Sequence, residues 1–159
     1  MVEGLIDKKI LDHIFKEYNI DCSTLISYGN QADSHFEAIK ENFGENFFRK
    51  NLFILVDSDD SGKKAKQNYI TKNNFDKNNI MELSELLNVE DGLSIEIEFL
   101  YNDEGYKEYQ ELIEKEKNNS HQIKKIKTDL FSKNFGNMNK KKIEVFVTNI
   151  KQRLGANNV

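Results

Sequence analysis

The sequence contains no proline and only one cysteine, Cys22, among its 159 residues. A single thiol excludes an intrachain disulfide and every zinc site built on paired cysteines. We expect Cys22 to be a small buried residue at the start of a strand. No apolar run approaches the length that crosses a bilayer, and no basic segment leads into an apolar stretch with a cleavage site. These absences predict a cytoplasmic protein without membrane contacts.

Neither sign of charge dominates the sequence. Charged residues make up 31% of the chain, but acidic and basic residues nearly balance at a formal net charge of −4. This balance argues against a protein that coats DNA generally, although an acidic cluster that binds cations would shift the total the same way. Hydrophobic residues are spread along the chain, which argues against wholesale disorder. We expect one domain over residues 1–159, with a core over about 1–100 and a helical extension over about 101–159.

The hydrophobic pattern alternates between strands and helices. Met1 to Gly4 resemble the end of a strand followed by a turn. Strands are predicted over residues 22–28, 52–56 and 80–83, and helices over 7–18, 32–43, 63–70, 84–87, 106–116, 122–130 and 141–154. Residues 94–99 alternate as an additional strand would. This order predicts an α/β fold with a central, mostly parallel sheet flanked by helices and a helical C-terminal extension.

Carboxylates gather at two predicted strand ends. Glu3 and Asp7 follow the first strand, and Asp57 and Asp59 follow the most hydrophobic one. Because active groups collect at the carboxyl ends of parallel strands, we expect these acids to share one crevice. Their mutual repulsion is commonly relieved by a hard cation such as Mg²⁺ or Mn²⁺. Alternatively, Asp7 is a helix N-cap and Asp59 a turn former, with Gly62 easing the backbone.

Two motifs carry a resemblance to a known family. Glu3-Gly4-x-x-Asp7 and Asp57-x-Asp59-x-x-Gly62, in this order, resemble the Toprim domain of topoisomerases, bacterial primases, small nucleases and OLD-family endonucleases. The C-terminal Toprim nuclease domain of the OLD family is the most similar, because residues 94–96 resemble its additional Ser-x-Glu motif.

The resemblance implies a Toprim-type, Rossmann-like fold and a site that holds two Mg²⁺ or Mn²⁺ ions. Such a site hydrolyses DNA phosphodiester bonds by two-metal catalysis, with a lysine from a late helix adding positive charge to the transition state. The implied metal ligands are Glu3, Asp7, Asp57, Asp59, Ser94 and Glu96, and the run Lys140-Lys141-Lys142 offers the lysine, with Lys141 and Lys142 as candidates. Glu98 competes with Glu96, since an alternating strand places both on one face; residues 94–99 are alternatively a plain edge strand.

The same resemblance implies a larger assembly. The chain has no Gly-x-x-x-x-Gly-Lys loop, so an ATPase domain or subunit would be a separate partner in an OLD-like nuclease, in the setting of anti-phage defence. It also allows a homo-oligomer. RNA is an alternative substrate, and a non-catalytic metal-binding α/β assembly module is an alternative function.

Basic residues concentrate in the last quarter of the chain. They are Lys124, Lys125, Lys127, Lys133, Lys140, Lys141, Lys142, Lys151 and Arg153. Beside an acidic cation site, such a segment predicts a backbone-directed track for DNA. The alternative is a solvated helix face.

Overall fold

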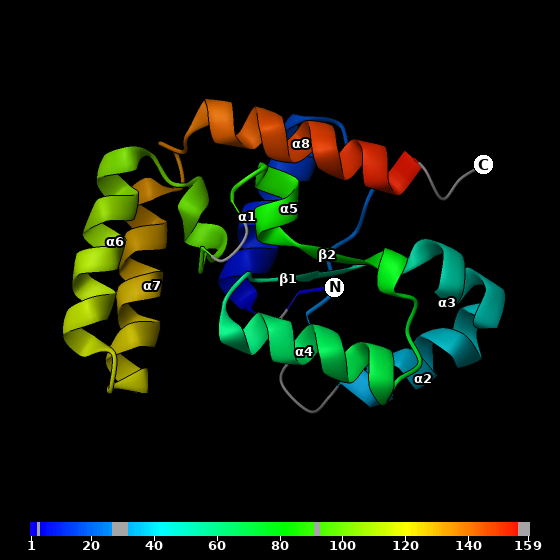
Figure 1. Cartoon of the computed structure of the whole chain (residues 1–159). Coiled ribbons are helices and arrows are strands. Elements are labelled where there is room, and N and C mark those ends of the chain that lie inside the picture. Colours follow the sequence, from blue (N-terminus) through cyan, green and yellow to red (C-terminus); the bar gives the residue numbers. More distant parts are fainter. Residues whose placement is uncertain (3, 27–31, 91–92, 156–159) are drawn as a thin grey trace.

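A small parallel sheet lies at the centre of the molecule (Figure 1). The computed structural model describes residues 1–2, 4–26, 32–90 and 93–155. Strand β1 (Ile54–Val56) pairs in parallel with β2 (Ile80–Glu82). All residues of β1 are buried, as expected for a strand covered on both faces.

Two shorter segments extend this sheet on the other side of β1. The Leu55 N–H donates to the Met1 carbonyl at 2.9 Å, and the Val2 N–H donates to the Leu25 carbonyl at 2.9 Å. Val2 also forms a parallel bridge with Ile26. The spatial order is therefore 25–26, 1–2, β1 and β2. In chain order this is second, first, third and fourth, the arrangement of doubly wound α/β sheets.

Helices cover both faces of the sheet. Leu55 and Met81 pack into one core, whereas Ile54, Val56 and Ile80 pack into a second core with aromatic side chains. The helices are α1 (Leu5–Glu17), α2 (Ala32–Phe43), α3 (Glu45–Asn51), α4 (Asp60–Thr71), α5 (Leu83–Leu87), α6 (Asp103–Glu116), α7 (Ser120–Asn134) and α8 (Lys140–Gly155), with short 3-10 helices η2 (Lys77–Asn79) and η3 (Ile97–Leu100). In Figure 1, α6 and α7 form a pair on the opposite side of the molecule from α2 and α3.

The α/β class predicted from the sequence is confirmed, but in a helix-rich form. Helices make up 68% of the residues that the structure describes, and the two regular strands among them are short. Helix α3 was not predicted. The predicted strand over residues 94–99 is wrong, because its second half coils into η3. Cys22 is exposed rather than buried. Within the predicted strand over residues 22–28, only Ile26 forms a bridge among the described residues; residues 27 and 28 lie outside them.

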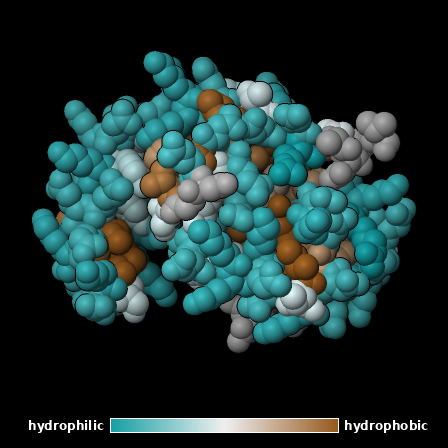
Figure 2. All heavy atoms as spheres, viewed as in Figure 1, coloured by the Kyte–Doolittle hydropathy of each residue, from teal (hydrophilic) through white to brown (hydrophobic). Residues whose placement is uncertain are grey.

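The surface is mostly hydrophilic, with small apolar areas. Figure 2 shows a mainly hydrophilic face on which hydrophobic atoms gather in several small patches. A groove between α3 and the end of α8 is lined by Leu25, Phe43, Phe47, Phe53 and Leu154, among others. None of the described helices combines the length and the apolar character that a bilayer crossing requires.

Candidate acidic site at the carboxyl edge of the sheet

The first two candidate acids lie at adjacent strand ends. Asp57 follows β1 directly, and Asp7 lies in the first turn of α1, which begins shortly after Val2. Successive connections leave the 1–2 segment and β1 towards opposite sides of the sheet. This is the switch point at which open α/β sheets form a crevice.

Asp7 is fixed by the start of its helix. Its Oδ2 accepts a hydrogen bond from the Gly4 N–H at 2.9 Å, so it satisfies the free amide ahead of α1 from the third helical position. The N-cap itself is Gly4. Burial raises the pKa of Asp7, against the opposing effect of the Lys127 ammonium. The interpretation of Asp7 as the N-cap is therefore wrong, but its position in the capping box is compatible with a role beside the other acids.

The pKa of Asp57 is influenced by all the other acids of the site. Burial, together with the negative charges of Asp7, Glu96 and Glu98, raises its pKa to about 8 against the opposing effect of Lys127. An ordinary aspartate titrates near pH 4. Asp57 consequently stays protonated at neutral pH when no cation is bound. Too little positive charge lies nearby to stabilise its ionised form.

Glu96 is the N-cap of η3, and Glu98 lies within η3. The Ser58 N–H donates to the Ile95 carbonyl at 2.9 Å, which places this segment beside the end of β1. The Glu98 side chain is buried, and neither of its carboxylate oxygens accepts a hydrogen bond from the described residues. Burial raises its pKa to about 7 although Lys127 opposes the shift. A buried carboxylate without donors is costly, so such a group commonly marks a function.

Lys127 of α7 provides the positive charge of the site. Its Nζ lies 2.9 Å from Glu96 Oε2 and 3.5 Å from Glu98 Oε1. Burial opposes ionisation, but the two carboxylates outweigh it and raise the pKa of Lys127 above its usual range. The Tyr109 hydroxyl of α6 donates to the same Glu96 oxygen. Helices α6 and α7 thus each place one hydrogen-bond donor, Tyr109 and Lys127, against the Glu96 carboxylate.

No family model, curated protein or solved structure matches the chain. The Toprim resemblance therefore depends on its motifs and on the positions of Asp7 and Asp57 at neighbouring strand ends. In the part of the chain that the structure describes, no three Asp, Glu, His or Cys side chains stand ready to hold a metal ion. Instead, the Lys127 ammonium nitrogen lies near two of the acids, Glu96 and Glu98.

Sequence reasoning missed Lys127 as a site residue, although the helix pattern marks it. Ile123, Lys127 and Leu130 recur at steps of four and three residues, so this lysine occupies a position on the apolar stripe of α7. A lone charge on such a stripe needs a buried partner. The structure does not bring the expected lysines there: Lys141 is exposed, and Lys142 lies 3.2 Å from Asp103 and over the Phe99 ring at 4.1 Å.

The structure gives the remaining predicted ligands no contact with these acids among the described residues. Glu3 is one of the residues that the structure does not describe. Ser94 is exposed. Asp59 is the N-cap of α4, and its Oδ1 accepts a hydrogen bond from the Gly62 N–H at 2.6 Å. Their roles as ligands stay predictions.

The predicted DNA track is weaker than its count of basic residues suggests. Lys133 and Arg153 form ion pairs with Glu108 and Glu85. Lys127 and Lys142 are also paired, and Lys151 donates to a backbone carbonyl. The exposed remainder comprises Lys124, Lys125, Lys140 and Lys141.

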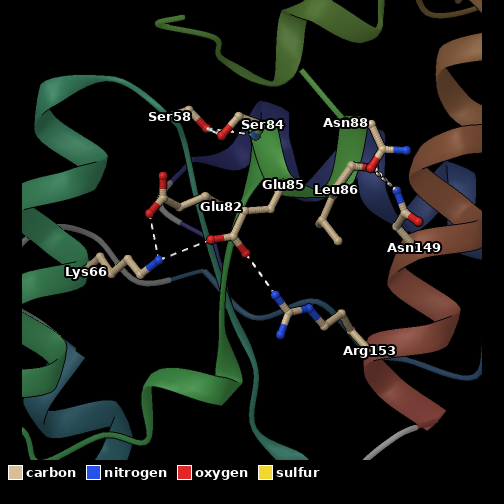
Figure 3. A network of polar contacts seen from close by, with 9 residues as sticks. All are labelled: Ser58, Lys66, Glu82, Ser84, Glu85, Leu86, Asn88, Asn149 and Arg153. Carbon is tan, nitrogen blue, oxygen red and sulfur yellow. Dashed lines mark hydrogen bonds and ion pairs between the residues drawn. The ribbon is translucent and has the colours of Figure 1, made fainter. Parts of the chain in front are cut away.

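Buried serines hold the loop after Asp57 in place. The Ser58 hydroxyl donates to Ser84 Oγ at 2.8 Å and accepts from the Ser84 N–H at 2.8 Å (Figure 3). This double contact fixes the loop to the start of α5. Figure 3 also shows Lys66 bridging Glu82 and Glu85, and Arg153 on Glu85. Helices α4, α5 and α8 are thereby tied to the end of β2.

The cap of α4 allows a test of Asp59. We expect Asp59→Ala to lower the free energy of unfolding by about 1 kcal/mol, whereas Asp59→Ser stays within about 0.5 kcal/mol of wild type because serine caps equally well. Urea denaturation of the metal-free protein measures both. An equal loss in the two variants would contradict the capping role. Loss of Mn²⁺ binding in the stable Asp59→Ser variant would assign Asp59 to the cation site.

Proposed function

We propose that this chain is a Toprim-type, metal-dependent nuclease module that hydrolyses phosphodiester bonds in DNA. The observation that carries the proposal is that Asp7, Asp57, Glu96 and Glu98 lie close enough to influence one another electrostatically, with the Lys127 Nζ 2.9 Å from Glu96 and 3.5 Å from Glu98. Structural ion pairs usually balance their charges, but here four acids face a single lysine. The excess of negative charge suits a cation better than it suits a packed core.

The acids of this site carry the oxygen donors that Mg²⁺ and Mn²⁺ prefer, although no three of them stand in position for a metal ion among the described residues. Hard divalent cations prefer carboxylate oxygens, and the Glu98 oxygens accept no hydrogen bond from the described residues, with the Lys127 ammonium 3.5 Å away. Asp57, Glu98 and Asp7 would hold the cation, with Glu96 beside them and Glu3, Asp59 and Ser94 as further predicted ligands. When bound, one or two such ions supply Lewis acidity towards the phosphate and lower the pKa of a water molecule.

The chain's own groups would then position the substrate. The Lys127 ammonium lies beside Glu96 when no cation is bound, and once a cation occupies the acids it would be free to offset the charge of a phosphate, while Tyr109 restrains the Glu96 carboxylate. Lys124 and Lys125 on the same helix are exposed and suit contacts to the phosphate backbone. Binding of this kind is independent of base sequence and weakens as salt rises.

The larger setting is part of the proposal. By the same resemblance, an ATPase domain or subunit of an OLD-like nuclease would be the partner of this module. Anti-phage defence would be its biological context. A homo-oligomer is compatible with the apolar groove between α3 and α8.

Cleavage of supercoiled plasmid tests the activity. We expect nicking in Mg²⁺ or Mn²⁺, none in EDTA, and a decrease of about 100-fold or more in Glu98→Gln, which removes a charge without changing the side-chain shape. Glu111→Gln, an exposed residue of α6, is the matched control and should cleave as wild type does. Absence of nicking by the wild type, or full activity of Glu98→Gln, would refute the proposal. Matched DNA and RNA duplexes distinguish the two substrates.

A non-catalytic assembly module is the second candidate. The observation that favours it is the Lys127 nitrogen beside Glu96 and Glu98, which already neutralises part of the acidic charge. A module of this kind predicts no nicking of either polymer. It also predicts that calorimetry with Mn²⁺ gives the same weak signal for wild type and Asp57→Asn.

A further inference from the structure

We propose that Lys127 and a divalent cation are alternative occupants of the acidic crevice, so that cation binding displaces Lys127 and loosens the α6–α7 pair from the sheet edge. This inference depends on the proposed function, because it requires the crevice to bind a cation. It adds that the Lys127 ammonium group occupies the site until a cation binds.

The first argument is the position of the ammonium group. Lys127 Nζ lies 2.9 Å from Glu96 and 3.5 Å from Glu98, and its side chain is only 26% exposed. A cation held by Glu98 needs those carboxylate oxygens within about 2.0–2.6 Å. Because two positive charges in one buried crevice repel each other strongly, the ammonium group and the cation compete for the same oxygens.

The second argument is the charge balance. Asp7, Asp57, Glu96 and Glu98 all influence one another, and Lys127 is the cation that acts on the three whose pKa values are raised. One ammonium group therefore faces four carboxyl groups. A divalent cation supplies twice the charge without the conformational restriction of a lysine side chain. Exchange of one for the other is therefore favourable when the cation is present.

The third argument is how α6 and α7 are attached. The Tyr109 hydroxyl and the Lys127 ammonium, one from each helix, meet on the same Glu96 oxygen. Helix α7 is also held by apolar packing, because Leu130 is buried in the core that includes Ile10 and Leu11 of α1. Withdrawal of Lys127 from the acids therefore removes the ion pairs of α7 with Glu96 and Glu98 and leaves its apolar contacts in place.

Calorimetric titration with MnCl₂ alone tests the competition. We expect Lys127→Met to bind Mn²⁺ about tenfold more tightly than wild type, which corresponds to about 1.4 kcal/mol. Lys133→Met is the matched control, because Lys133 is an exposed lysine of the same helix that pairs with Glu108, away from the acids. Its Mn²⁺ affinity should equal that of wild type.

Hydrogen exchange of the unaltered protein tests the movement without a variant. Mn²⁺ should accelerate exchange of α7 amides several-fold and slow or preserve exchange in β1. Mn²⁺ binding that is equal in wild type and Lys127→Met would overturn the competition, while plasmid cleavage by wild type would keep the proposed function. Slower α7 exchange upon Mn²⁺ binding would also overturn it. Absence of Mn²⁺ binding in both proteins would overturn this inference and the proposed function together.

Discussion

Asp57→Asn is expected to abolish metal-dependent cleavage and, at the same time, to stabilise the metal-free protein at pH 8. The substitution removes a carboxylate that would hold the cation. It also removes a charge that the folded protein accommodates poorly, since burial and three neighbouring acids raise the pKa of Asp57 to about 8. Sites that are strained for function commonly show this opposition between activity and stability.

The pH dependence follows from the direction of the shift. Below about pH 4 Asp57 is protonated in both the folded and the unfolded chain, so wild type and Asp57→Asn are equally stable there. Between about pH 4 and pH 8 the folded state retains the proton that the unfolded state has lost, and the stability of wild type falls as pH rises. Glu98, with a pKa of about 7, contributes in the same direction. We expect Asp57→Asn to be more stable than wild type by about 1–3 kcal/mol at pH 8.

Urea denaturation in EDTA at pH 4, 6 and 8 measures this difference, and plasmid nicking measures the activity. Asp60→Asn is the matched control, because Asp60 is exposed in the first turn of α4. It should retain cleavage and show no gain in stability with rising pH. A wild type that grows more stable than Asp57→Asn from pH 4 to pH 8 without metal would contradict the electrostatic description of the crevice.

Gly62→Ala is expected to destabilise the protein severely and to abolish cleavage. Gly62 is buried in the first turn of α4, and an added methyl group would overlap the Asp57 carbonyl oxygen and lie 2.8 Å from its carbonyl carbon. Backbone atoms cannot rotate away as a side chain would. We expect a loss of about 3 kcal/mol, with a decrease of roughly 10 °C in the melting temperature.

Gly136→Ala is the control for this effect. A methyl group at Gly136 meets no other atom within 4 Å, so its stability should stay within about 0.5 kcal/mol of wild type. Thermal denaturation followed by circular dichroism compares the two variants. A melting temperature of Gly62→Ala equal to that of wild type would show that α4 can move away from Asp57 without cost.

The sequence identified the acids at the strand ends but not their full environment. The run before Asp57 is apolar without alternation, which predicts a buried strand, and the spacing around Asp7 predicts a helix start. Both features depend on local patterns. Gly62 was also singled out, but its role differs: it permits close approach to Asp57 and does not supply an unusual backbone angle. A close approach between elements is not visible in local sequence.

Lys127 and Glu98 show why the rest was harder to predict. The strand expected over residues 94–99 treated Glu96 and Glu98 as equivalent, but the η3 turn buries Glu98 and leaves Glu96 partly exposed. The prediction of Lys141 and Lys142 depends on their position at the start of a helix. In the structure, the lysine beside the acids is Lys127, within α7. Long-range packing of this kind overrides the periodicity of a short segment.

The two cores on opposite faces of β1 divide the protein into regions of different mutational tolerance. Asp7, Glu96 and Lys127 belong to elements around the core that includes Leu55, whereas Phe36, Phe48 and Phe75 fill the core on the far face. Substitutions in the aromatic core should change stability additively with changes at the acids, because the sheet separates them. The aromatic half can thus vary through evolution or be redesigned for thermostability while the acidic edge keeps its chemistry.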